Sequence, residues 1–134
     1  MYEPIRNKSV HTVAEADFPH RTRAEELDIR LAGHLTALLT VTDELRALTP
    51  SDELDEAAQA LAAHVVRLGK GRMPLRAAPS VTSADPGHVA TLHQRAHTLA
   101  GHAVVVADYR EDEAAALAAE RAEAHASALG LTAA

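Results

Sequence analysis

The chain has 134 residues, enough for one domain with a single modest core. Its formal net charge of −6 argues against generic nucleic-acid binding, and the absence of cysteine excludes disulfide and thiolate chemistry. Because 47% of the residues are hydrophobic and only 2% are aromatic, the core has to consist of leucine, valine and alanine, which favours an all-α protein over a β-sheet protein.

The first helix is expected over residues 22–48. The sequence before it has no clear hydrophobic period and contains two prolines, which predicts an irregular N-terminal arm over 1–21. Thr22 and Glu25 have the spacing of a capping box, in which each side chain accepts a hydrogen bond from the other residue's backbone N–H. Apolar or small residues then recur every three or four positions, at Leu27, Leu31, Leu35, Leu38, Thr42 and Leu45.

A second helix is expected over 50–69. Pro50 suits the first helical position and Thr49 can cap it, while the acidic residues that follow match the helix dipole. Gly69 and Gly71 are expected to end the helix. The stripe of this helix comprises Leu54, Ala57, Ala58, Leu61, Val65 and Leu68. Because only a short turn separates the first two helices, they should form an antiparallel hairpin.

Residues 70–85 form the one long loop of the predicted domain. Long loops in small domains commonly have a function or are disordered. The simplest interpretation here is a crossover between two helical hairpins. The alternative is a contact for an anion or a protein partner, made by the basic side chains of Lys70, Arg72 and Arg76.

Two further helices are expected, over 86–108 and 109–129. The third has a regular stripe of Val89, Leu92, Ala96, Leu99, Ala103 and Val106. Arg110 falls in phase with that stripe, which predicts a break near Asp108, where Asp108 and Glu111 have the spacing of a capping box. The alternative is one continuous helix of roughly 65 Å, which is too long for a monomer of this size and would imply a dimer.

Together these elements predict an all-α four-helix bundle of two antiparallel hairpins, in a single domain over 22–130. No apolar run reaches the roughly 18 residues of a membrane span. The first residues lack the apolar segment of a signal peptide, so we expect a cytoplasmic protein that does not enter the membrane. Lys8 and Lys70 are the only lysines among 13 lysines and arginines, which indicates a high-GC bacterial genome rather than a function.

The chain contains nine histidines, and two of them lie one helical turn apart. His93 and His97 form an HxxxH pattern, the spacing that a helix needs to offer two imidazoles to one metal ion. Both are expected at the border of the third helix's apolar stripe. Gln94 occupies the position of the glutamate in the HExxH motif of zinc hydrolases, so the pattern is weak and is more typical of solvated histidines.

His34 and His64 flank the stripes of the first two helices at equal distances along the chain from Thr49. We therefore expect them at similar heights in the hairpin, where they could face each other. The third helix could add His88, His93 or His102. Three neutral imidazoles from different helices would suit Zn, Ni or Fe with open coordination positions. The candidate metal ligands are thus His34, His64, His93 and His97, and the alternative is partly buried histidines bonded to backbone carbonyls.

No sequence motif indicates an enzyme. The GxSxG nucleophile motif, the glycine-rich phosphate loop and the paired ExxH motifs of di-iron bundles are all absent. The segment over 111–130 is rich in alanine, and Leu117 and Leu129 are its only large apolar residues. We therefore expect a non-enzymatic protein that acts by self-association, as a homodimer, or by binding a protein partner. The alternative is a metal-binding bundle with histidines from several helices.

Overall fold

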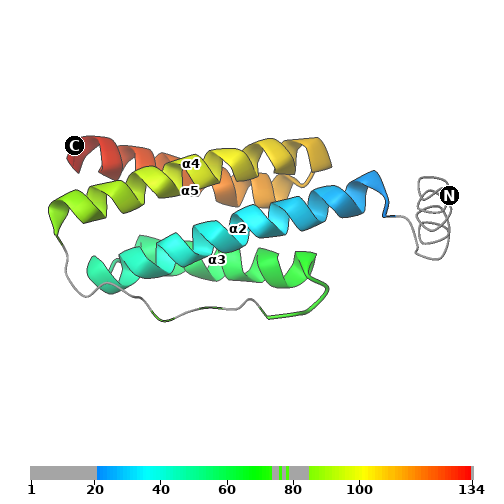
Figure 1. Ribbon diagram of the computed structural model, residues 1–134, viewed down its shortest axis with the longest axis horizontal. Coiled ribbons are helices and arrows are strands. Elements are labelled where there is room, and N and C mark those ends of the chain that lie inside the picture. Colours follow the sequence, from blue (N-terminus) through cyan, green and yellow to red (C-terminus); the bar gives the residue numbers. More distant parts are fainter. Residues whose placement is uncertain (1–20, 74–75, 77, 79–84, 134) are drawn as a thin grey trace, which may run out of the picture.

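The computed structural model describes residues 21–73, 76, 78 and 85–133 of the chain. Four α-helices and no strands make up this part of the chain, which confirms the all-α four-helix bundle (Figure 1). The predicted N-terminal arm lies outside the described residues except for Arg21. The helices are α2 (Arg23–Leu48), α3 (Asp52–Leu68), α4 (Pro86–Arg110) and α5 (Glu113–Ala133).

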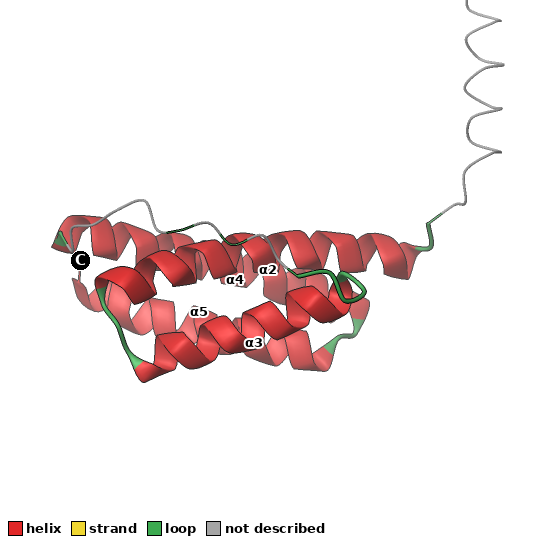
Figure 2. Ribbon diagram, turned by 90° about the horizontal axis from the view of Figure 1, so that it is seen from below, coloured by secondary structure: helices red, strands yellow, loops and turns green. Residues whose placement is uncertain are grey.

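The helices pair into two antiparallel hairpins, α2 with α3 and α4 with α5 (Figure 1). Helix α2 packs on both α3 and α4, and α4 packs closely on α5, whereas α3 and α5 touch only sparsely. Helix α3 ends at the opposite end of the bundle from the start of α4, as expected for a crossover between two hairpins (Figures 1 and 2). The sparse contact between α3 and α5 is the feature that shapes the candidate site.

Helix α2 begins with the capping box that its sequence predicts. The Thr22 hydroxyl accepts a hydrogen bond from the Glu25 N–H at 3.0 Å, and the Glu25 carboxylate accepts one from the Thr22 N–H at 3.1 Å. All six residues of the predicted stripe are buried, together with Leu39 and Val41. Helix α2 is therefore the central element of the core, which fits its contacts with two neighbouring helices.

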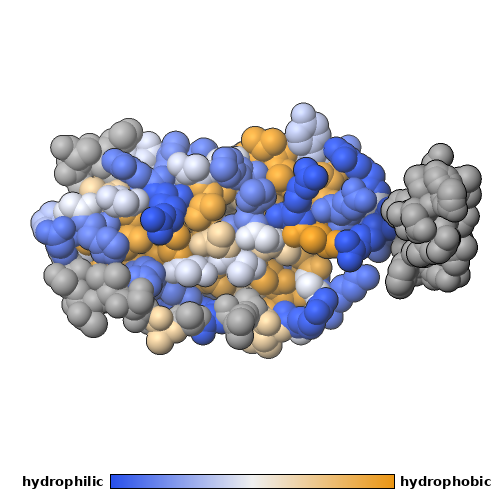
Figure 3. Space-filling view, in the orientation of Figure 1, coloured by the Kyte–Doolittle hydropathy of each residue, from blue (hydrophilic) through white to orange (hydrophobic). Residues whose placement is uncertain are grey.

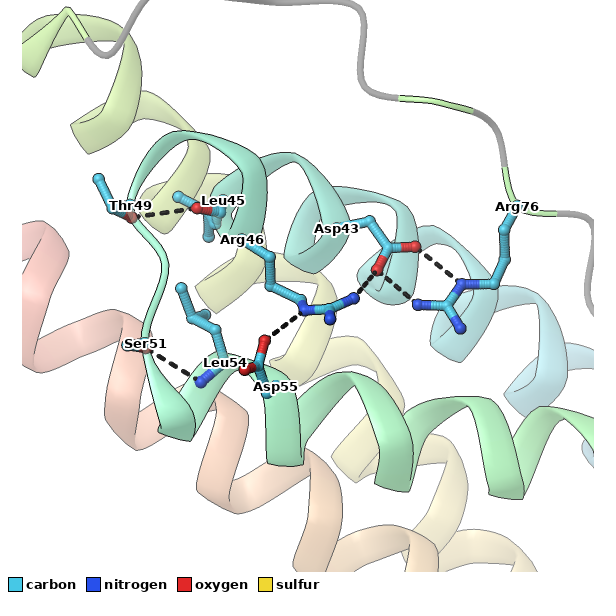
Figure 4. A network of polar contacts seen from close by, with 8 residues as sticks. All are labelled: Asp43, Leu45, Arg46, Thr49, Ser51, Leu54, Asp55 and Arg76. Carbon is cyan, nitrogen blue, oxygen red and sulfur yellow. Dashed lines mark hydrogen bonds and ion pairs between the residues drawn. The ribbon is translucent and has the colours of Figure 1, made fainter.

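The turn between α2 and α3 is capped differently from the prediction (Figure 4). Thr49 ends α2 instead of starting α3, because its N–H and its hydroxyl both donate to the Leu45 carbonyl. Ser51 is the N-cap of α3, and its hydroxyl accepts from the Leu54 N–H at 3.1 Å. The predicted cap was wrong because Thr49 satisfies a free carbonyl of the preceding helix, which leaves the next hydroxyl to cap α3.

An ion-pair network ties the long loop to the first hairpin (Figure 4). The Arg76 guanidinium binds Asp43 of α2 through two hydrogen bonds, of 2.6 and 2.9 Å. Arg46 donates to the same carboxylate at 3.1 Å and to Asp55 of α3 at 2.8 Å. Burial alone would raise the pKa of Asp43, but the hydrogen bonds from Arg76 and Arg46 outweigh burial and hold that pKa below its ordinary value.

Helix α3 ends at a left-handed residue that is not one of the predicted glycines. Lys70 has φ of 58°, while Gly69 has φ of −87°. The Gly71 N–H donates to the Val66 carbonyl at 2.8 Å, which closes the helix end in the pattern of a Schellman motif. The helix therefore stops where the sequence predicts, although a lysine adopts the strained conformation.

Helices α4 and α5 are separate, so the continuous-helix alternative is wrong. Glu111 is left-handed, with φ of 61° and ψ of 36°, and the Asp112 N–H donates to the Ala107 carbonyl at 2.9 Å. The Asp112 carboxylate then caps α5 by accepting the Ala115 N–H at 3.1 Å. The predicted break is thus confirmed, two residues beyond Asp108, and Asp112 instead of Asp108 caps the last helix.

Arg110 explains why the break comes later than predicted. Although it lies in phase with the apolar stripe of α4, its Nε donates to Asp28 of α2 at 2.8 Å. The aliphatic part of the side chain can follow the stripe while the guanidinium reaches a carboxylate at the surface.

None of the described helices is long and apolar enough to cross a membrane.

Candidate functional site

A cavity of about 370 Å³ lies between α3 and α5, where these two helices touch only sparsely. Its walls come from all four helices and are mainly apolar. Six of the thirteen α3 and α5 side chains that line it are alanines, which are too short to fill the space between the two backbones. The apolar lining consists of Leu38, Leu45, Leu54, Ala57, Ala60, Ala96, Ala114, Leu117, Ala118, Ala122 and Ala126.

Seven polar side chains also line this α3/α5 cavity. They are Thr42, Glu53, Glu56, His64, His93, Arg121 and His125. Only His64 and His93 among them are candidate site residues from the sequence. Polar groups in an otherwise apolar cavity fix the orientation of a ligand, so their geometry decides which chemistry the cavity can accept.

His93 is buried, with 3% of its surface exposed, and does not border the stripe of α4 as expected. The buried face of α4 is turned by roughly 40° toward His93 relative to the predicted stripe. Val89, Leu99 and Val106 of that stripe are only partly buried. Small residues replace them at the helix contacts, where Ala96, Ala100, Ala103 and Ala107 let the neighbouring helices approach closely. Small side chains thus set the rotation of α4, which hydrophobicity alone did not predict.

His93 meets His125 of α5 inside the bundle. The two ring centroids lie 6.0 Å apart, with the rings inclined by 64°. Nδ1 of His125 lies 2.8 Å from a carboxylate oxygen of Glu53, so this contact bridges α5 and α3. His93 Nδ1 and His125 Nε2 are both buried and have no hydrogen-bond partner among the described residues. A buried polar atom that stays unpaired costs roughly 1–3 kcal/mol, so two such atoms side by side need a physical explanation.

The surroundings of the cavity favour uncharged histidines. Burial lowers the pKa of His93, and the nearby His125 lowers it further. Burial also lowers the pKa of His64, and the adjacent Arg67 lowers it more than Asp112 raises it. Arg67 donates to Nδ1 of His64 at 2.8 Å and to Asp112 at 2.9 Å. His64 is therefore held at the cavity edge by a guanidinium, whereas His93 has a free ring nitrogen.

The structure does not bring the four predicted metal ligands together. His34 packs edge-on against His102 of α4, with ring centroids 5.5 Å apart, and its pKa is lowered by burial, then by His102 and Arg30. His64 lies against Arg67, His93 lies against His125, and His97 is exposed. Within residues 21–73 and 85–133, no three histidine, aspartate or glutamate side chains are grouped to hold a metal ion. Metal binding by these histidines stays a prediction without geometric support.

One of the three basic side chains predicted to bind an anion or a partner already forms an ion pair within the chain. Arg76 is bound by Asp43, so its guanidinium already has an anionic partner. Lys70 and Arg72 are exposed. Arg76 is exposed as well, so all three side chains reach solvent and one of them already has a carboxylate partner.

His125 and Glu53 are site residues that the sequence did not reveal. His125 lies in phase with Ala118 and Ala122 of α5, so its position on the inner face of that helix could have been recognised. Glu53 was explained by the dipole of α3, which accounts for an acidic residue there without any role in a site. The contact between His125 and Glu53 depends on how closely α3 and α5 pack, and no sequence pattern within a single helix predicts that distance.

Comparison with known protein families, with curated protein sequences and with solved structures found no match to the chain. The function therefore has to be inferred from the geometry of the bundle.

Proposed function

We propose that this protein binds a small, mainly apolar organic molecule in the α3/α5 cavity. The observation that carries the proposal is an apolar cavity of about 370 Å³ lined by two histidines with unpartnered buried nitrogens. Small-molecule sites in proteins typically measure roughly 300–1,000 Å³ and combine apolar walls with a few polar groups. Both features are present in this cavity.

The energetics of the cavity support a ligand. Cavities in protein interiors are destabilising because the atoms that line them lose packing contacts. Alanines on α3 and α5 keep this space open, although larger apolar residues at the same positions would fill it. A molecule that occupies the cavity recovers those contacts, and its polar group can pair with a histidine nitrogen that otherwise has no partner.

Association with a second copy or a protein partner is a second candidate, supported by the surface of α5. Leu117 and Leu129 are 49% and 43% exposed on that helix. Among the residues whose side chains the structure describes, Ile29, Met73, Val105 and Tyr109 are the other large apolar ones that are exposed. On the face shown in Figure 3, apolar surface forms separate patches between hydrophilic residues. A stable interface buries roughly 800 Å² on each partner, so dispersed patches make a weaker case than the cavity.

Binding is tested with an aromatic hydrocarbon of suitable size, 2-methylnaphthalene, whose fluorescence reports transfer from water to an apolar site. The wild-type protein should bind it saturably at one site and gain thermal stability with increasing probe concentration. Ala118→Phe fills the cavity from α5 and should weaken binding at least tenfold. The matched control is Ala124→Phe, which adds the same side chain at an exposed position of α5 outside the cavity and should leave binding unchanged.

Two results would contradict the proposal. The first is a wild-type signal that rises without saturation, as expected for weak contact with the surface. The second is an equal loss of binding in Ala118→Phe and Ala124→Phe. Light scattering on the same samples tests the second candidate, since self-association predicts a mass above that of the 14.2 kDa monomer.

A further inference from the structure

We infer that the ligand of the α3/α5 cavity carries an uncharged O–H or N–H group and donates it in a hydrogen bond to Nε2 of His125. The inference rests on the proposed function and adds the chemical class of the ligand. Three features support it: which nitrogen of His125 carries the proton, the other polar groups that line the cavity, and the charges of those groups.

Glu53 determines which nitrogen of His125 carries the proton. A carboxylate can only accept a hydrogen bond, so Nδ1 of His125, 2.8 Å from Glu53, must be the N–H that donates. In an uncharged imidazole the other nitrogen then has a lone pair and acts as an acceptor. Nε2 is that nitrogen, and it has no partner among the described residues. His125 lines the cavity, so its imidazole is a side chain that a bound molecule can contact.

The Thr42 hydroxyl is a second group in the cavity that can accept a hydrogen bond from a ligand but cannot donate one. The Thr42 hydroxyl donates to the Leu38 carbonyl one turn back along α2, at 2.8 Å. Its remaining lone pairs can only accept. Besides the carboxylates of Glu53 and Glu56, the lining thus contains two acceptors, His125 Nε2 and Thr42 Oγ1, that a donor on the ligand can satisfy. A ligand with only acceptor atoms would leave both without a partner.

The charges around the cavity argue against an ionic ligand. Glu53 and Glu56 contribute two carboxylates to the lining, and Arg121 contributes one guanidinium. These three groups together carry one net negative charge, which disfavours an anion. A cation would lose its hydration against walls of leucine and alanine, which is unfavourable unless it forms a close ion pair. An uncharged hydrogen-bond donor on the ligand avoids both costs and can pair with Nε2 of His125. Alcohols, phenols and N–H heterocycles of limited size are the classes that fit.

The test compares two probes of nearly equal shape, 2-naphthol and 2-methylnaphthalene, at pH 8, where an ordinary imidazole is uncharged. The measured quantity is the ratio of their dissociation constants, which isolates the contribution of the hydroxyl. In His125→Leu the preference for 2-naphthol should fall about tenfold, the factor that corresponds to one net hydrogen bond. His97→Leu is the matched control, since it makes the same replacement at an exposed position of α4 outside the cavity, and its ratio should equal that of the wild type.

A second variant removes the orienting carboxylate at a position that is easy to replace. Glu53 is 75% exposed, so Glu53→Ala should fold normally. It should weaken the preference for 2-naphthol by a smaller factor, because the proton of His125 is then free to occupy either nitrogen. Nitrogen-15 spectra of the imidazole should show this directly, with Nδ1 protonated in the wild type and a mixture of tautomers in Glu53→Ala.

The outcomes separate this inference from the proposed function. If both probes bind and the ratio is the same in the wild type and in His125→Leu, the donor inference is overturned while the cavity remains a binding site. If neither probe binds saturably, both are overturned. A wild-type spectrum with Nε2 protonated at pH 8 would also overturn the donor inference, whatever the affinities.

Discussion

Glu111 has a left-handed backbone conformation, which is more often adopted by glycine. Its φ of 61° lies in the left-handed region, where a side chain with a Cβ atom is strained by roughly 1 kcal/mol. The conformation is needed because the chain reverses there within two residues, between Arg110 and Glu113. The tight hairpin of α4 and α5 is therefore formed at a local energetic cost.

Replacing Glu111 with glycine should stabilise the protein. We expect Glu111→Gly to raise the free energy of unfolding by about 0.5–1 kcal/mol, measured by urea denaturation. The control is Glu120→Gly on the exposed side of α5, which should lower it by about 1 kcal/mol because glycine is unfavourable within a helix. A loss of stability in Glu111→Gly would show that the side chain makes a contact worth more than the strain.

One buried and two half-buried histidines make stability depend on pH, with a sign that follows from their lowered pKa values. His34, His64 and His93 all have a native pKa below the ordinary value of 6.5, and burial is the largest cause in each. As the pH falls below 6.5, the unfolded chain binds protons that the native state does not. The free energy of unfolding should therefore be constant above about pH 7.5 and fall with acidification, until the native pKa values are passed.

His93 should contribute a measurable part of this acid sensitivity. Within the bundle it faces His125, which in turn contacts Glu53. We expect His93→Leu to lose less stability than the wild type between pH 7 and pH 5, measured by chemical denaturation at each pH. Replacement of the exposed His97 by leucine serves as the control. Parallel curves for the wild type and His93→Leu would mean that the histidine at position 93 does not resist protonation.

At the scale of elements, the ion pair between Asp43 and Arg76 joins the long loop to α2. The two hydrogen bonds are parallel, and Asp43 is largely shielded from solvent. We expect a coupling energy of about 0.5–1 kcal/mol between Asp43→Asn and Arg76→Gln in a double-mutant cycle measured by urea denaturation. Arg72→Gln, at an exposed position of the same loop, should show no coupling to Asp43→Asn.

The helices themselves were predictable because each depends on patterns within about twenty residues. The leucine stripe of α2 and the Thr22 capping box both appear in the structure as expected. The helix ends were less predictable, since Thr49, Ser51, Asp108 and Asp112 can all cap a helix and the local competition decides among them. The rotation of α4 was wrong for a related reason, because its alanines contact two other helices more closely than its larger residues do.

At the scale of the whole molecule, the α3/α5 cavity results from an uneven distribution of contacts. The α4–α5 and α2–α4 pairs are well packed, whereas α3 and α5 are held apart. No local pattern predicts which pair of four helices will pack loosely, so neither the cavity nor the pairing of Glu53 with His125 could be found from the sequence. Histidines of different helices do lie against each other, His93 against His125 and His34 against His102, but as two pairs and not as the predicted group of metal ligands. The contact expected from the sequence was the one between His34 and His64.

Filling the cavity should stabilise the ligand-free protein while it removes binding. Ala118→Leu places an apolar side chain in the space between α3 and α5, and we expect a gain of about 1 kcal/mol in the free energy of unfolding. Ala124→Leu, outside the cavity, should change it by less than about 0.5 kcal/mol. Strong destabilisation by Ala118→Leu would indicate that α3 and α5 pack too closely to leave a cavity of about 370 Å³ between them.

The central claim is that an apolar molecule occupies the α3/α5 cavity, and the alanine methyl groups test it most directly. Carbon-13 methyl spectra should be recorded while 2-methylnaphthalene is added to alanine-labelled protein. The methyl signals of Ala57, Ala60, Ala96, Ala118 and Ala122 should shift together and saturate, while those of the exposed Ala63 and Ala124 stay in place. Shifts that are absent, or that are as large at Ala63 and Ala124 as in the cavity, would contradict the claim.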